Sequence, residues 1–377
     1  MRWSRPIRPL APRPQSSSSR PARKLVRIND SASANILARP LAGGRHSIVR
    51  RIGVVLVAFL VVSLLGLAGF RLAAYVREAD VAQAIAPRTG RFVETGHGRM
   101  FLQDQGPRDR IPIVLIHGTA AWSEFWRGTI DHLLQQGHRV VALDLPPFGF
   151  SDRSPTGAYT RRDQARRIIG ALDALGVERA VLVGHSFGAG ATVEAVMLYP
   201  TRVAGLVLVA AALGLPPEGT EVAPASRVVD AFLNLPVLLE LVVSATLTNP
   251  LLTRQLLATM IARKEAATPE LADILRRPMT RQGTTRDFVA WVRGFVSPDM
   301  AAVSMSSSRY REIAVPTRLI WGDQDTLTPL AQGQRLADLI PDARLKTLVS
   351  LGHIPQIEDV AAFRLALDAA LADTFPR

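Results

Sequence analysis

The longest uninterrupted apolar stretch of the chain lies near its N-terminus. Residues 52–70 are nineteen positions without a charged side chain, and arginines stand directly before and after them. As a helix this stretch is about 28 Å long, which matches the hydrocarbon thickness of a bilayer. A buried helix of a soluble domain keeps a polar stripe, whereas only Ser63 and three glycines interrupt this one. The pattern therefore predicts a transmembrane helix over residues 52–71.

Further along the chain, short apolar runs alternate with longer amphipathic segments. The runs have four to six residues and are bounded by glycine or polar residues, at 113–116, 140–145, 180–183, 206–209 and 318–321. Runs of this length, separated by helix-length segments, are typical of buried parallel strands joined by helical crossovers. The pattern predicts an α/β domain in which helices cover both faces of a mostly parallel, doubly wound sheet.

This alternation stops between residues 213 and 313. The segment is helix-like and has no evident strand, which predicts a helical cap inserted into the α/β domain. Residues 236–247 are apolar but too short to span a bilayer, and Glu240 interrupts them. For these residues a lid helix packed on the main domain is favoured over a surface that dips into the membrane.

Positive charge is concentrated before the apolar helix. The chain of 377 residues has 45 basic and 32 acidic side chains, and residues 1–51 contain twelve of the basic ones but a single acid, Asp30. Basic residues beside a spanning helix stay on the cytoplasmic side. We therefore expect a single-pass protein of the cell (inner) membrane, with its N-terminus in the cytoplasm and the α/β domain outside. A cleaved signal peptide is the main alternative, but a typical signal peptide has a shorter basic leader and a shorter apolar region than this chain has.

The leader at residues 1–51 is rich in proline and serine and has no apolar periodicity, which predicts a disordered basic cytoplasmic tail. Solvated charges that fix the topology are favoured over a site for nucleic acid or anionic lipid, since no aromatic residues are interleaved with the arginines. We expect no nucleic-acid partner. Residues 72–90 are expected to be a linker to the α/β domain.

The absence of cysteine removes several chemistries. Without cysteine the chain has no thiol nucleophile, zinc–thiolate site or disulfide framework. None of Lys24, Lys264 and Lys346 follows a glycine, so the phosphate-binding G-K-[ST] loop is missing, and neither G-x-G-x-x-G nor H-E-x-x-H occurs. We expect no metal and no organic cofactor.

The sharpest chemical motif is Gly184-His185-Ser186-Phe187-Gly188, directly after one predicted strand and before a helix-like segment. A serine on a tight strand-to-helix turn needs neighbours without bulky side chains, so that its hydroxyl is exposed at the end of the sheet. The motif alone is weak, but its placement after a strand strengthens it. Ser186 is therefore the candidate nucleophile.

A serine hydroxyl needs a base to remove its proton and an acid to orient that base. Six of the seven histidines precede Ser186, and only His353 follows it, after the apolar run that would form the last strand. Asp325 lies in the loop after the strand at 318–321 and is the candidate acid. Asp323 is the nearby competitor and would instead cap its turn.

A further candidate element is His117-Gly118-Thr119-Ala120, again directly after a predicted strand. One backbone amide from this loop and the amide of Phe187 would stabilise a negative oxygen on a reacting carbonyl. We assign the loop's contribution to Thr119, with Ala120 in reserve.

Together these motifs make residues 91–377 resemble the α/β-hydrolase superfamily. They stand in the order of that family, with D-x-P-x-F-G-x-S at 144–151 between the His-Gly loop and the serine turn. Pro147 departs from the glycine of many relatives, outside the catalytic triad. The resemblance implies a core at residues 91–212 and 314–377, and a cap at 213–313 that shapes the substrate pocket.

The resemblance also implies the roles of single residues: Ser186 as nucleophile, His353 as base and Asp325 as acid. The dehalogenases and epoxide hydrolases of the family use aspartate where this chain has Ser186, so those activities are not favoured. Trp126 and Phe187 are similar in placement to aromatic residues that line the family's pockets, and we expect Trp126 and His117 to contact substrate.

These features predict a membrane-anchored serine hydrolase, similar to a carboxylesterase or lipase. It would cleave an ester-type bond of a small or lipid-like substrate through an acyl-enzyme, with residues 52–70 in the membrane. The same triad supports hydrolysis of a carbon–carbon bond and acyl transfer to an alcohol, so both stay open. A non-catalytic binding protein of this fold is a third possibility, against which the intact triad argues.

Overall fold

The apolar runs of the chain form the strands of one sheet. The computed structural model describes residues 43–215, 227–296 and 299–375. The sheet runs in the order β1-β2-β4-β3-β5-β6-β7-β8. Its strands are β1 Arg91–Thr95, β2 Gly98–Gln105, β3 Ile113–Ile116, β4 Val140–Leu143, β5 Ala180–His185, β6 Val203–Val209, β7 Thr317–Gly322 and β8 Ala343–Leu348.

Strands β3 to β8 are parallel, while β1 and β2 form an antiparallel hairpin that pairs with β4. The mostly parallel α/β sheet is therefore confirmed. The hairpin was not among the predicted strands. Its sequences, RFVET and GRMFLQDQ, mix apolar and charged residues because β1 lies at the edge of the sheet and is only partly buried.

The described helices fall into two groups, those outside the insertion between β6 and β7 and those within it. The helices outside that insertion are α1 Gly43–Arg77, α2 Ala82–Ile85, α3 Arg127–Gln135, α4 Arg161–Ala174, α5 Phe187–Leu198, α11 Leu330–Leu339, α12 Pro355–Glu358 and α13 Val360–Thr374. Those in the insertion are α6 Arg227–Leu233, α7 Pro236–Ala245, α8 Thr253–Met260, α9 Pro269–Arg276 and α10 Thr284–Val296. Short 3-10 turns supplement both groups.

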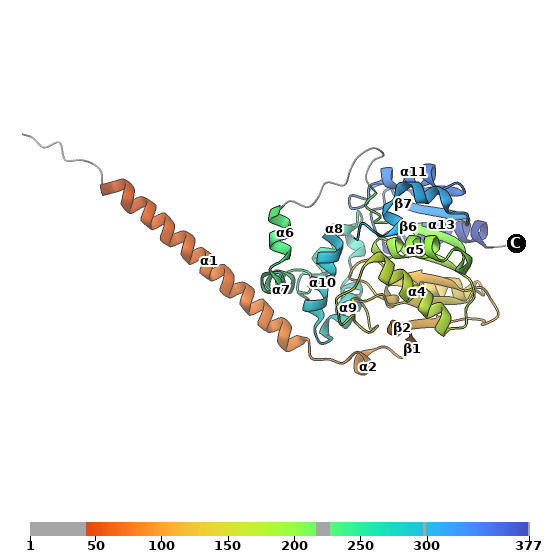
Figure 1. Ribbon diagram of the computed structural model, residues 1–377, viewed down its shortest axis with the longest axis horizontal. Coiled ribbons are helices and arrows are strands. Elements are labelled where there is room, and N and C mark those ends of the chain that lie inside the picture. The colour runs from red at the N-terminus through yellow and green to blue at the C-terminus, as the bar shows by residue number, and fades with distance from the viewer. Residues whose placement is uncertain (1–42, 216–226, 297–298, 376–377) are drawn as a thin grey trace, which may run out of the picture. The chain divides into compact units, whose positions relative to one another are not determined.

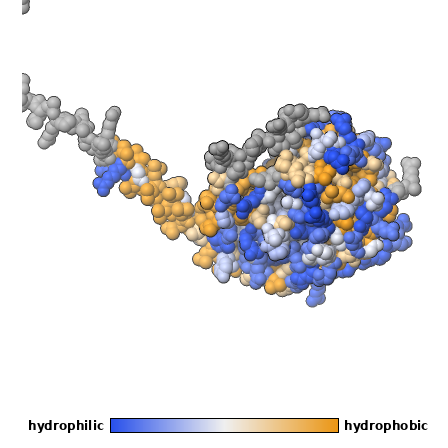
Figure 2. Space-filling model, in the orientation of Figure 1, coloured by the Kyte–Doolittle hydropathy of each residue, from blue (hydrophilic) through white to orange (hydrophobic). Residues whose placement is uncertain are grey.

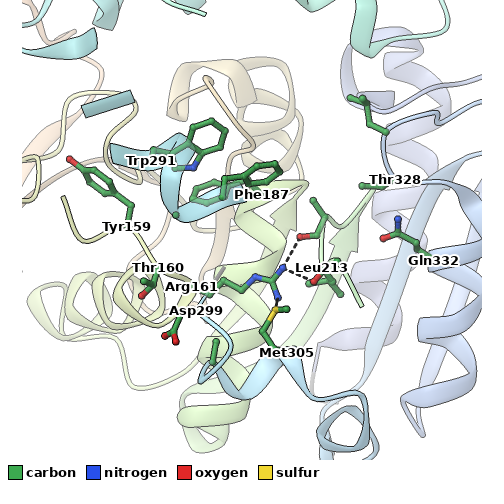
Figure 3. Close-up of a pocket in the computed structure, with 16 residues that line it drawn as sticks. Tyr159, Thr160, Arg161, Phe187, Leu213, Trp291, Asp299, Met305, Thr328 and Gln332 are labelled. Atoms are coloured by element: carbon green, nitrogen blue, oxygen red, sulfur yellow. Dashed lines mark hydrogen bonds between the residues drawn. The ribbon is translucent and has the colours of Figure 1, made fainter. Parts of the chain in front are cut away.

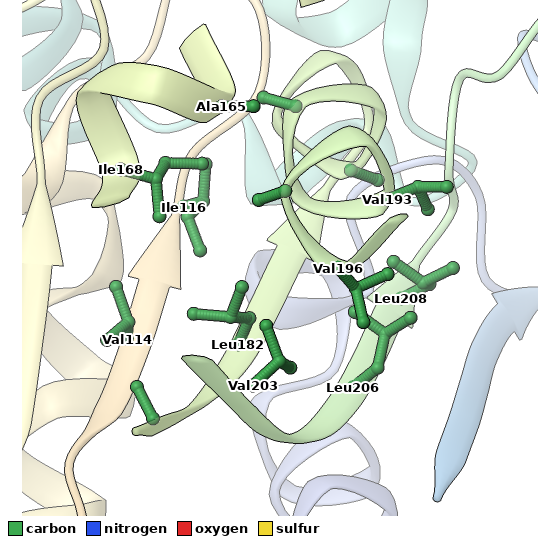
Figure 4. Packing of buried hydrophobic residues seen from close by; sticks show 14 of the residues in the cluster. Val114, Ile116, Ala165, Ile168, Leu182, Val193, Val196, Val203, Leu206 and Leu208 are labelled. Carbon is green, nitrogen blue, oxygen red and sulfur yellow. The ribbon is translucent and has the colours of Figure 1, made fainter. Parts of the chain in front are cut away.

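Helices cover both faces of the sheet because successive strand residues point to opposite sides. Val114 and Ile116 of β3 pack with α4, α5 and α11 on one face, as Figure 4 shows for α4 and α5. Ile113 and Leu115 of the same strand pack with α3 and α13 on the other face. Each face buries its own apolar cluster, so the strand ends are held rigidly and can position side chains.

The insertion between β6 and β7 is helical, as expected, and the described residues from 210 to 316 contain no strand. Figure 1 shows α7 to α10 grouped together. The expected cap limit at residue 313 needs adjustment on packing grounds, since Tyr310 and Ile313 are buried in the same cluster as the sheet residues. The last part of the predicted cap thus belongs to the core by its contacts.

Helix α1 is longer than the predicted span at both ends. It continues through Arg77, so residues 72–77 of the expected linker are helical. Over Ile48–Arg77 it is long and apolar enough to cross a membrane, and it is the one helix of the described residues that meets this criterion. Figure 2 shows its surface as largely apolar. Residues 1–42 of the expected disordered tail lie outside the described residues.

Candidate active site

The turn after β5 holds Ser186 in a strained backbone conformation. Its φ of 50° and ψ of −119° lie outside the regions that most residues adopt. Two glycines permit the turn. A Cβ on Gly184 would lie 2.8 Å from the Cα of Ala189, and a Cβ on Gly188 would lie 2.7 Å from the side chain of Ile116. Such a turn presents the serine hydroxyl at the carboxyl edge of the sheet.

Three side chains from separate loops meet at this edge. The Ser186 hydroxyl donates to Nε2 of His353 across 2.8 Å, and Nδ1 of His353 donates to Oδ2 of Asp325 across 2.9 Å. They follow β5, β8 and β7, whose carboxyl ends share one edge because these strands are parallel. All three residues are buried, with at most 5% of their surface exposed. The arrangement is that of a nucleophile, a base and an orienting acid.

Asp325 is held as a carboxylate by several donors. One oxygen accepts the backbone amide of Thr328 at 2.8 Å, and the other accepts its hydroxyl at 2.6 Å. Burial acts to raise the pKa of Asp325, but the hydrogen bond and charge of His353, together with Thr328, outweigh burial and lower it. Asp323, the competing acid, accepts the Ser350 amide at 2.7 Å and so caps the loop instead.

Several backbone amides near Ser186 have no partner. The amide of Phe187 is the first of α5, where no intrahelical acceptor exists. In the part of the chain that the structure describes, the amides of Thr119 and Ala120 donate to no backbone or side-chain acceptor. Their loop lies against the serine turn, because a Cβ on Gly118 would be 3.1 Å from the Cβ of Ser186. The oxyanion roles of Thr119 and Phe187 stay predictions, with Ala120 equally free to donate.

His117 and Trp126 do not line the cavity above Ser186, so we correct the expectation that they contact substrate. His117 is fully buried, with Nδ1 donating to the Gly118 carbonyl and Nε2 accepting the Leu145 amide, both at 2.8 Å. Burial lowers the pKa of His117 to about 4, so its ring is neutral. Trp126 is fully buried beside Phe363. Both side chains therefore have a structural role beneath the loops that border the cavity.

Two buried residues to which the sequence assigned no role hold the base in place. Nε2 of His185 donates to the His353 carbonyl at 2.9 Å. Burial, and then the neighbouring His353, lower the pKa of His185 to about 3. The carboxylate of Glu358 accepts the amides of Gly352 and Ile354, on either side of His353, at 2.9 and 3.1 Å.

Glu358 also reaches the cap. One of its oxygens accepts the amides of Ala262 and Arg263, which follow α8, at 2.8 and 3.1 Å. In addition, the amide of His353 donates to the carbonyl of Met260 at 3.3 Å. The loop that carries the base is therefore bonded directly to the cap. In the sequence, Glu358 is marked only by its position five residues after His353. That pattern is too common to predict the role of Glu358.

A cavity of about 210 Å³ is lined by Ser186 and by the cap. Among the described residues that line it there is no Arg, Lys, Asp or Glu. Its cap side is mostly apolar: beside Thr253, Thr259 and Trp291, it is formed by Leu247, Leu256, Leu257, Met260, Leu275, Met279 and Phe288. Thr253 and Trp291 also line it and are buried, and neither the Thr253 hydroxyl nor the Trp291 ring N–H has a hydrogen-bond partner in the structure. The cavity therefore fits an apolar molecule with few polar atoms.

A second cavity of about 260 Å³ lies against the other side of Trp291. Figure 3 shows it with Arg161, whose guanidinium donates to the carbonyls of Ala212 and Leu213 at 3.3 and 2.6 Å. Although it is larger, Ser186 does not line it. We therefore place the chemistry in the smaller cavity, where the nucleophile is.

The described residues contain no cluster of three or more His, Asp or Glu side chains that could ligate a metal ion. The ring nitrogens of the two histidines are hydrogen-bonded within the protein. Those of His353 contact Ser186 and Asp325, and those of His117 contact two backbone groups.

Comparisons with known proteins agree with this geometry. Residues 111–253 match a family model described as the alpha/beta hydrolase fold. The chain is 30% identical over 302 residues to the 2-hydroxymuconate semialdehyde hydrolase of Pseudomonas sp. (strain CF600), covering 76% of this chain and 95% of the relative.

Solved structures extend the comparison. A meta-cleavage product hydrolase from Pseudomonas fluorescens IP01 superposes with a TM-score of 0.61 and 26% identity, covering 75% of this chain and 98% of the other. A bacterial membrane phospholipase A superposes with a TM-score of 0.56, covering 87% of this chain and 98% of the other. At 22% identity the second likeness shows the fold alone.

Proposed function

The chain belongs to the α/β-hydrolase superfamily, and within it we propose that it is a serine hydrolase that breaks a carbon–carbon bond beside a carbonyl group. The observation that carries the proposal is the hydrogen-bonded chain of Ser186, His353 and Asp325 against an apolar cavity. The substrate in the name of the Pseudomonas relative is the reason for proposing a carbon–carbon bond first. A muconate semialdehyde has no ester or amide, so hydrolysis of that compound breaks a carbon–carbon bond.

In the proposed reaction, His353 removes the proton of Ser186, whose oxygen attacks the carbonyl carbon. The amides of Phe187 and Thr119 stabilise the negative oxygen, and losing one such donor raises a barrier by about 3 kcal/mol. The carbon–carbon bond then breaks. The leaving carbon, whose electron pair is delocalised into a conjugated system, takes its proton from His353. Water activated by His353 finally releases the acyl group from Ser186 as an acid.

Ester hydrolysis is the second candidate, and one observation keeps it open because it favours an uncharged substrate. The muconate compound named for the relative carries a carboxylate, whereas the described lining of the cavity above Ser186 has no arginine or lysine to pair with one. Burying an unpaired carboxylate is strongly unfavourable. An uncharged ester or an uncharged ketone fits this lining better, and the triad attacks either carbonyl by the same first step.

We also propose that α1 anchors the protein in a membrane, with the N-terminus on the cytoplasmic side. The apolar surface of Ile48–Arg77 and the basic residues of 1–51 support this topology. A reporter that works only outside the cytoplasm, fused after residue 377, is expected to be active. A silent fusion in a protein that is otherwise folded would reverse the proposed orientation.

The reaction is tested first with a fluorophosphonate probe on the full chain in detergent. The probe is expected to label wild-type protein and not Ser186→Ala. Ser304→Ala is the matched control, since Ser304 is also buried but lies outside the cavity. Folded wild-type protein without any label would contradict a serine nucleophile.

The bond is tested next by comparing kcat/KM for three compounds. These are 2-hydroxymuconate semialdehyde, a conjugated diketone without a carboxylate, and a p-nitrophenyl alkyl ester. We expect the uncharged diketone to be cleaved faster than the muconate compound. If the ester alone turns over, the carbon–carbon proposal is wrong and the second candidate replaces it.

A further inference from the structure

The cap exposes large apolar side chains near the end of α1. Val237 and Leu251 are 74% and 79% exposed. They form a set with other exposed residues of α6, α7 and the turn before α8, which we call the cap apolar surface: Val229, Phe232, Leu235, Val237, Leu247 and Leu251.

The end of α1 is bonded to the same part of the cap. Arg71 forms an ion pair of 2.8 Å with Glu240 of α7, and the Arg77 guanidinium donates to the Thr248 carbonyl at 2.8 Å. Just beyond the helix, the carboxylate of Glu78 accepts the Thr285 amide at 3.1 Å. These contacts cover about 9 Å along the axis of α1. The cap apolar surface thus lies on the part of the cap that the end of the proposed membrane anchor contacts.

The contacts also place the cap beside the C-terminal end of the apolar run of α1. Arg71 is the first charged residue after the apolar run at 52–70, so it marks where a spanning helix leaves the hydrocarbon. Its partner Glu240 lies three residues after Val237 in α7, and residues at this spacing share one face of a helix. Tyr75, 72% exposed, is an aromatic residue about one turn beyond Arg71.

The cap apolar surface reaches the cavity of Ser186. Leu247 belongs to both, because it is 36% exposed and also lines the cavity. Thr253 and Leu256, from the first turns of α8, line the cavity directly after the exposed Leu251. An apolar molecule that entered at Leu247 would meet only uncharged side chains on its way to Ser186.

We propose that the cap apolar surface rests in the interface of the bilayer that α1 spans, and that apolar substrates reach Ser186 from the lipid past Leu247. This inference rests on the proposed membrane anchor. A bilayer is favoured over a protein partner because the surface adjoins a helix of membrane-spanning length, and because the cavity behind it is itself uncharged.

The absence of cysteine allows a direct test in the full chain. Single substitutions Val237→Cys and Leu251→Cys are labelled with an environment-sensitive fluorophore and reconstituted in phosphatidylcholine vesicles. Leu365→Cys and Val349→Cys are matched controls, since both residues are 73% exposed on the core. Phe59→Cys, within the apolar run of α1, reports on the anchor.

We expect emission from positions 237 and 251 to shift to the blue and to be quenched by brominated lipid at least about threefold more than emission from 365 and 349. If position 59 is quenched but 237 and 251 behave like the controls, the cap inference is overturned while the anchor stands. If position 59 is not quenched, the anchor itself fails. A blue shift at 237 without quenching by lipid would indicate a second copy of the chain on this surface and would also overturn the inference.

A functional measurement separates delivery from chemistry. Val237→Glu and Leu251→Glu are expected to lower, about tenfold, the rate on a long-chain substrate dissolved in the vesicle membrane. The rate on a short, water-soluble substrate should not change, because neither residue lines the cavity. Leu365→Glu is the control for added charge. An equal rate on the vesicle substrate for wild type and both cap variants would contradict delivery from the lipid.

Discussion

The edge of the sheet and the cap line the same cavity, but they differ in how their side chains are held. At the sheet edge, Ser186, His353 and Asp325 are hydrogen-bonded to one another, and the turn around Asp325 supplies further donors. On the cap side, the lining is mainly side chains without polar atoms, such as Leu256 and Phe288. The first region therefore indicates a type of reaction, and the second indicates only the polarity and size of what is bound.

The strongest test of this contrast concerns the acid. Asp325→Asn should lower kcat on the order of 10⁴-fold with little change in KM, because an amide no longer stabilises the charged ring of His353. Asp323→Asn is the control, since an asparagine oxygen still accepts the Ser350 amide. Steady-state kinetics measure both. Equal losses in the two variants would mean that the acid has been misassigned.

The link between the two regions is tested by Glu358→Gln. The amide replaces an acceptor with a donor that faces backbone N–H groups, which costs about 1–3 kcal/mol of folding free energy. Displacement of the His353 loop should lower kcat and the rate of fluorophosphonate labelling together, by about 10- to 100-fold. Glu312→Gln changes an exposed acid and should leave both rates unaltered. Lost stability with unaltered labelling would limit Glu358 to a structural role.

The wall of the cavity is tested by Trp291→Ala. Trp291 lines both cavities and packs edge-on against Phe148 and Phe187, so its removal should join the two spaces. We expect the preference for long over short acyl chains to rise about tenfold and the stability to fall by about 3–5 kcal/mol. Phe295→Ala removes a half-exposed ring stacked on Trp291 and should leave the preference unchanged. An unchanged preference in Trp291→Ala would place the substrate elsewhere.

The smallest expected effect concerns His117 and acid stability. Unfolded histidine binds a proton near pH 6.5, whereas burial lowers the pKa of folded His117 to about 4. Its contribution to stability is therefore present above pH 6.5 and is lost as the pH falls toward 4, by up to about 1.4 kcal/mol per pH unit. In His117→Gln, the unfolding temperature should depend less steeply on pH over this range. An identical pH dependence would show that this ring is not neutral in the folded protein.

Much of the sheet edge could be predicted because its signals are local. The strand before Ser186 contains the apolar run AVLV and the strand before Asp325 contains LIW, and the two glycines around Ser186 lie within two residues of it. The structure brings together the residues that these motifs single out, although their catalytic roles await the kinetic tests. Expectations failed where a role depends on distant partners. His117 is occupied by the Leu145 amide, and Glu358 bonds residues about a hundred positions away.

The cap was predictable only as a helical insertion. Which of its residues line the cavity depends on how α7 to α10 pack, and apolar residues on a helix do not reveal which neighbour they face. The expectation of an ester-cleaving enzyme came from the triad, which acts on several kinds of carbonyl. The relatives now favour a carbon–carbon bond, and the uncharged lining argues for a less acidic substrate than the one named for them.

The double attachment of Glu358 has a consequence for partly unfolded molecules. Because one carboxylate satisfies amides from both the His353 loop and the segment after α8, detachment of either segment leaves the other with unpaired donors. Fraying of the cap would thus misalign the general base at the same time. A molecule whose cap has unfolded would therefore lose its hydrolase activity, instead of exposing a working triad to other compounds.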